Sequence, residues 1–144
     1  MPTAQNFRNH ARIVPAYHVG VFVPFLANFI WATYRLIGSF SGETFIAFLV
    51  SIALLLLFFS VRVQVLTVQD RVIRLEMQLR MARVLPPDLQ QRAAALTPGQ
   101  LVALRFASDA ELPELVRDVL DGKLQKGKEI KQRVKNWQAD WLRA

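Results

Sequence analysis

Few side chains in this sequence could do chemistry, and they are poorly grouped for it. The chain has two histidines, both before residue 20, and no cysteine. Five carboxylates cluster within one short segment: Asp109, Glu111, Glu114, Asp118 and Asp121. In a helix, the first two would lie in the first turn and complement the helix dipole, while Glu114 and Asp118 would share one polar face. We therefore expect a solvated acidic surface here and not a metal site.

The sequence carries no motif for catalysis or cofactor binding. It has no zinc-protease, nucleophile-elbow, EF-hand or phosphate-binding pattern. Without cysteine it can form no disulfide, iron–sulfur cluster or thiolate zinc site. We expect a protein that is not an enzyme and needs no cofactor.

The elements that would position these side chains begin with two long apolar stretches. Between residues 13 and 34, His18 is the sole acidic or basic residue, and between residues 44 and 61 there is none. An apolar helix of about 20 residues crosses the hydrocarbon layer of a membrane. The pattern predicts a cytoplasmic lead-in (1–12), a first transmembrane helix (13–37), an external loop (38–43) and a second transmembrane helix (44–66).

The distribution of arginine sets the expected orientation in the membrane. Arg35 is the one basic residue near the loop, and Glu43 offsets it. Several arginines lie on the side of the two chain ends: Arg8, Arg12, Arg62, Arg71 and Arg74. Since basic residues stay on the cytoplasmic side, both termini are expected inside the cell.

Small and polar residues in the two spans are candidates for helix packing. They repeat at intervals of four and include Gly20, Pro24, Asn28 and Ala32 in the first span, and Ala47 and Ser51 in the second. Such residues let helix backbones approach closely in membranes. We expect a kink where Pro24 removes a bond to Gly20, and a hydrogen bond from Asn28 to Ser51. The alternative for Asn28 is the lining of a pore.

The second span is expected to continue as a helical stalk (67–85), giving one helix of about 40 residues. An apolar stripe with alternating spacings of three and four residues, which we call the seam, runs along it: Val65, Val68, Val72, Leu75 and Leu79. This spacing is typical of a coiled coil. The seam could pair with a second subunit or with the helices that follow, and the sequence leaves both possibilities open.

The segment 86–144 is expected to form short cytoplasmic helices. Pro86 and Pro87 end the stalk. Helices are predicted from Asp88 to Ala95, from Thr97 to Phe106, and from Ser108 to the glycine at position 122, with a capping box between Ser108 and Glu111.

A basic C-terminal helix is predicted to follow. Its candidate contacts with an anionic surface are Lys128, Lys131, Lys135, Trp137 and Trp141. Lysines beside tryptophans could bind anionic lipid headgroups and, less favourably, nucleic acid. Alternatively, the two tryptophans continue the stripe of Ile130 and Val134 and pack into the protein.

Three strings in the sequence are similar to those of a known family. They are LTVQDRVIRLEM at 66–77, LTPGQLVALRFASDAELP at 96–113 and KNWQADWLRA at 135–144. The chain resembles a family of small bacterial two-pass membrane proteins that is catalogued as a domain of unknown function. The resemblance runs from Asn6 to the C-terminus. It implies a bacterial inner-membrane setting and supplies no activity and no site residues.

Together these patterns predict an all-α protein with a transmembrane hairpin, a helical stalk and short cytoplasmic helices. The expected role is that of a homo-oligomeric scaffold or accessory subunit, with the lipid bilayer and further copies of itself as partners. An oligomeric channel or transporter-like pore is the alternative. A membrane-tethered binder of anionic lipid or nucleic acid is a second alternative.

Overall fold

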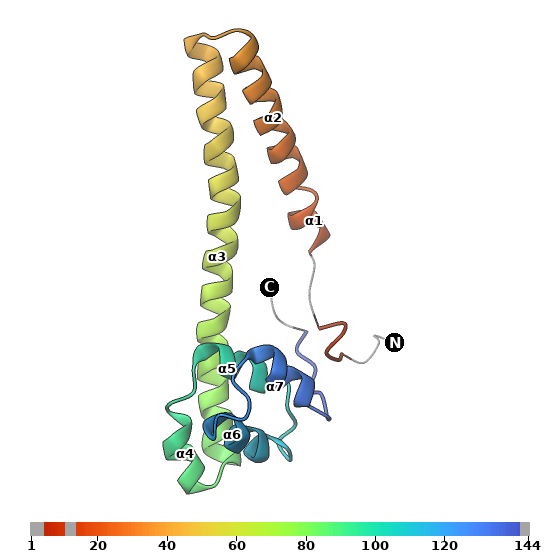
Figure 1. Cartoon of the computed structure of the whole chain (residues 1–144), viewed down its shortest axis with the longest axis vertical. Coiled ribbons are helices and arrows are strands. Elements are labelled where there is room, and N and C mark those ends of the chain that lie inside the picture. The colour runs from red at the N-terminus through yellow and green to blue at the C-terminus, as the bar shows by residue number, and fades with distance from the viewer. Residues whose placement is uncertain (1–4, 11–13, 142–144) are drawn as a thin grey trace. The chain divides into compact units, whose positions relative to one another are not determined.

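The computed structural model describes residues 5–10 and 14–141 and is built from helices (Figure 1). Their order is α1 (Pro15–His18), α2 (Phe22–Gly38), α3 (Gly42–Val84), α4 (Pro87–Ala93), α5 (Pro98–Leu104), α6 (Leu112–Leu120) and α7 (Gly127–Arg133). The described residues form no β-strand, and their one β-bridge joins Ala107 to Trp137. The expected all-α class is thus confirmed.

The chain divides into two compact units that share α3. The apolar unit comprises Ile13–Leu66, and the helical unit comprises Met1–Arg12 together with Thr67–Ala144. Two helical segments are long and apolar enough to cross a membrane: Pro15–Gly38, with 24 residues, and Gly42–Val84, with 43.

In the apolar unit, aromatic side chains join the first helical segment to α3. The rings of Tyr17 and Phe58 stack with centroids 4.3 Å apart, and those of Phe29 and Phe48 lie 5.8 Å apart. The Tyr17 hydroxyl also donates a hydrogen bond to the Phe58 carbonyl. Where α3 begins, the Ser41 and Thr44 side chains each accept a hydrogen bond from the other residue's backbone N–H, which satisfies two donors at the helix start.

The first helical segment is interrupted between α1 and α2, close to the kink that Pro24 predicts. A proline has no N–H to donate to the carbonyl four residues earlier, and its ring pushes that carbonyl away. That carbonyl belongs to Gly20, which lies in the interruption. Glycine is needed there, because a Cβ atom would come within 2.6 Å of the Ala16 carbonyl oxygen.

The helical unit has its own hydrophobic core, in which residues of α4 to α7 pack with the C-terminal part of α3 (Figure 1). Thr97 caps α5 and forms the reciprocal capping box with Gln100. Along α6, one apolar face is buried, including Leu112, Leu115, Val116 and Val119. After α6 the chain reverses through Gly122, whose φ of 78° lies in the left-handed region that favours glycine.

Two predicted helix bounds in this unit were wrong by more than two residues. The third short helix begins at Leu112, four residues later than expected, because residues before it form a turn in which the Glu111 carboxylate accepts from the N–H of Ser108. The C-terminal helix ends at Arg133, and Val134 has extended backbone angles, so the residues beyond it do not continue the helix. Their N–H groups are bound elsewhere: those of Lys135 and Asn136 donate to Glu111.

Candidate functional site

The C-terminal part of α3, from Val65 to Leu85 just past the helix end, has two apolar faces with opposite environments. One, which we call the docked face, is between 2% and 5% exposed and packs into the core: Ile73, Met77, Met81 and Leu85. The seam residues are between 42% and 69% exposed. At about 100° per residue, the seam lies on the opposite side of the helix from the docked face. The seam therefore lies outside the core that the described residues form.

This arrangement excludes one of the two roles that the sequence leaves open for the seam. The expectation that it docks the following helices is wrong, because the docked face fills that position. The docked face was missed in the sequence, although its spacing of four residues was a visible signal. Two apolar stripes on one helix look alike until the positions of the neighbouring helices are known.

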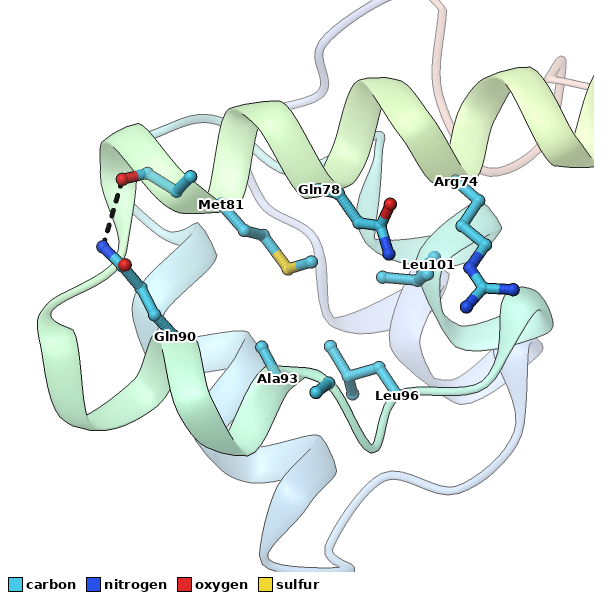
Figure 2. Close-up of a pocket in the computed structure, with 9 residues that line it drawn as sticks. Arg74, Gln78, Met81, Gln90, Ala93, Leu96 and Leu101 are labelled. Carbon is cyan, nitrogen blue, oxygen red and sulfur yellow. Dashed lines mark hydrogen bonds between the residues drawn. The ribbon is translucent and has the colours of Figure 1, made fainter.

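A pocket of about 250 Å³ opens beside the docked face (Figure 2). On α3 it is lined by Arg74, Gln78, Met81 and Ala82, and opposite them lie residues of α4, the following loop and α5. Gln90 closes one end, since its amide nitrogen donates to the carbonyl oxygens of Ala82 at 3.1 Å and Leu85 at 2.7 Å. Arg74 lies at the other end (Figure 2). This pocket could not be predicted from the sequence, because its far wall comes from residues that are distant along the chain.

The acidic cluster serves the fold of the helical unit. Arg80 pairs with Asp109 at 2.6 Å, Arg92 with Asp121 at 2.8 Å, and Lys123 with Asp118 at 2.8 Å. The Arg92 hydrogen bond lowers the pKa of Asp121, and the Asp118 hydrogen bond raises the pKa of Lys123. Both groups therefore stay charged near neutral pH. Among the described residues, no group of three or more potential metal ligands occurs.

The structure places the candidate packing residues of the apolar unit in two environments. Ala32 and Ser51 are buried, whereas Gly20, Pro24, Asn28 and Ala47 are exposed. The expected bond between Asn28 and Ser51 is absent from the part of the chain that the structure describes. The Ser51 hydroxyl instead donates to the Phe48 carbonyl at 2.6 Å, within its own helix. A buried serine can satisfy its hydroxyl in this way without a second helix.

The basic C-terminal segment packs against the helical unit through part of its predicted stripe. Ile130 and Val134 are buried, and the Trp137 ring lies 4.7 Å from that of Phe106. Trp141 is 53% exposed. Of the three predicted lysines, Lys128 and Lys135 are exposed, while Lys131 is half-buried with its amine 3.2 Å from Nε2 of His10. Contact of these residues with an anionic surface stays a prediction.

The N-terminal residues also contact this segment. The Gln5 amide nitrogen donates to the Asp140 carbonyl at 3.2 Å, and the Gln5 amide oxygen accepts from the Asp140 N–H at 2.9 Å. The Asp140 carboxylate in turn pairs with Arg105 at 3.0 Å. Residues from the two ends of the sequence thus belong to the same helical unit.

These features define an all-helical protein with two candidate membrane spans and one compact helical unit. The chain belongs to the family of unknown function DUF6526, whose model matches residues 1–144. The resemblance to a domain of unknown function is therefore confirmed over the full sequence. No curated protein and no solved structure matches the chain.

Proposed function

We propose that this protein is a membrane-anchored scaffold whose copies associate in parallel through the seam of α3. In this proposal the two candidate spans form a hairpin in a bacterial inner membrane, and α3 continues beyond the bilayer as a stalk. The single observation that carries the proposal is the exposure of all five seam residues, none of which is less than 42% exposed.

Membrane anchoring is supported by the side chains that the apolar unit leaves uncovered. Ile30 is 60% exposed, Ile37 82% and Leu56 63%, and the uncharged stretches carry many more apolar side chains of this kind. Each side chain of this size favours burial from water by about 1.5–3 kcal/mol. In a bilayer, lipid tails would cover these surfaces without any further protein contact.

A second copy of the chain fits the seam because the spacing is that of a heptad repeat. Position a is then occupied by Val65, Val72 and Leu79, and position d by Val68 and Leu75. In parallel coiled coils these positions interlock, and β-branched residues at position a favour two strands. Copies inserted in the same orientation would also have parallel α3 helices, as this packing needs.

The charges that flank the seam are complementary for a parallel pair. Arg71 falls at position g and Glu76 at position e, five residues later, so that each would face its counterpart on the other helix. Neither residue forms an ion pair within the part of the chain that the structure describes. Parallel pairing would bring these opposite charges together twice in each dimer.

No specific observation favours a channel. A pore would need polar side chains to face its lumen, yet the hydroxyls of Thr33 and Ser51 donate to carbonyls of their own helices. The second alternative, a binder of anionic lipid or nucleic acid, is not favoured either. The Trp137 ring packs on Phe106, so a structural role accounts for this tryptophan. We therefore retain the scaffold as the proposed function.

The mass of the full-length protein in mild detergent or nanodiscs tests the proposal. We expect the protein mass to be a multiple of 16.4 kDa, the mass of one chain. Two strands are favoured by the valines at position a, so the expected multiple is two. A mass of one chain at every protein concentration tested would overturn the scaffold proposal.

A further inference from the structure

We propose that the pocket between α3 and α4 binds a small organic anion, specifically a monocarboxylate with an apolar chain. This inference rests on the pocket alone and is independent of whether α3 self-associates. The pocket has an apolar interior, and at one end lies Arg74, which forms no ion pair with any described residue. Among the described residues, no acidic side chain lines it.

The interior of the pocket suits an apolar chain. Met81, Ala93, Leu96 and Leu101 are each at most 8% exposed and form its apolar walls. Figure 2 shows Ala93 and Leu96 facing α3 across the opening. The volume of about 250 Å³ is slightly below the range of about 300–1,000 Å³ for ligand sites. It therefore favours a short chain over a complete lipid.

The polar groups at the open end select for negative charge. Arg74 is the one ionisable residue in the lining, and it forms no ion pair with any residue that the structure describes. Asp70, one turn earlier on α3, is not part of the lining. A guanidinium group matches a carboxylate through two parallel hydrogen bonds. The charge complementarity therefore indicates an anion and disfavours an ammonium compound.

The two glutamines fix which way the ligand would lie. The Gln90 amide nitrogen is already used by two backbone carbonyls, so the end that it closes has no free donor from this group. Gln78 lies between Met81 and Arg74 on α3, and its amide makes no hydrogen bond within the described part of the chain (Figure 2). The carboxylate would thus bind Arg74 and Gln78, with its apolar chain directed toward Met81.

Methionine methyl NMR of the full-length protein in nanodiscs tests this inference, with octanoate as the probe. Met81 lines the pocket, whereas Met77 is buried one turn earlier and does not. We expect octanoate to shift the Met81 methyl signal saturably. Octylammonium, which has the same chain length and the opposite charge, should leave it unchanged.

Variants separate a real site from general insertion of octanoate into the bilayer. Arg74→Gln should weaken binding about tenfold by removing a charge-assisted pair, while Arg117→Gln, which removes an exposed charge on α6 outside the pocket, should not. Ala94→Trp, at an exposed position of the lining, should block binding without disturbing the core. Absence of a saturable shift, an equal shift with octylammonium, or unchanged binding by Arg74→Gln would overturn the inference.

Discussion

Replacement of both Val72 and Leu79 by glutamate is expected to abolish the proposed association through the seam and to leave the protein as a monomer. In a parallel pair, the double variant would place four carboxylates in the apolar seam, and a buried unpaired charge costs several kcal/mol. In a single chain the same positions are 48% and 69% exposed, so the helical unit should keep its fold. The expected result is a protein mass that falls to that of one chain while the thermal melting of the helical unit is unchanged.

A matched control adds the same charge away from the seam. Gln91 on α4 and Ala95 just after it are both exposed and lie outside the pocket lining. The double variant Gln91→Glu and Ala95→Glu should retain the mass of the unaltered protein. If the seam variant also keeps that mass, the seam does not join the subunits.

Truncation of Phe106 to alanine is expected to have the largest effect on the stability of the helical unit. The side chain is fully buried and lies against Trp137, and the Arg105 guanidinium lies 4.4 Å from its ring centroid. Removal of a buried aromatic ring of this kind costs about 3–5 kcal/mol in free energy of unfolding. Melting followed by circular dichroism, together with a shift of tryptophan emission to longer wavelength, measures the effect.

Trp141→Ala provides the comparison for this prediction. Trp141 is 53% exposed, so its truncation should cost about 1 kcal/mol or less. Equal destabilisation by Phe106→Ala and Trp141→Ala would contradict the packing described for the C-terminal segment. Such a result would mean that the two aromatic positions contribute alike to the core.

The long helix and its C-terminal end could be predicted because they depend on residue types that are close together in the sequence. Between residues 43 and 85 there is no glycine or proline, and two prolines follow. The structure accordingly has one helix, Gly42–Val84. The cap at Thr97 and the chain reversal at Gly122 were predictable for the same reason, since each depends on residues that are close in the sequence.

The rest depends on contacts between distant residues. The stripe from Ile130 to Trp141 fits a helix, yet the chain leaves the helix after Arg133 because Glu111 binds two of its N–H groups and the Phe106 carbonyl accepts from Gln138 at 2.8 Å. Similarly, the periodicity of apolar residues could not show which of the two stripes on α3, the seam or the docked face, is buried. Only the positions of α4 to α6 determine which stripe of α3 becomes buried.

Cysteine cross-linking in native membranes tests parallel association most directly, because the natural chain has no cysteine. In a parallel, in-register pair, a single cysteine at seam position d meets its own counterpart at a distance that suits a disulfide. We expect Leu75→Cys and Val68→Cys each to give a covalent dimer on mild oxidation. Arg117→Cys, exposed on α6 and outside the seam, should remain monomeric. Equal cross-linking at position 117, or none at either seam position, would contradict association through the seam.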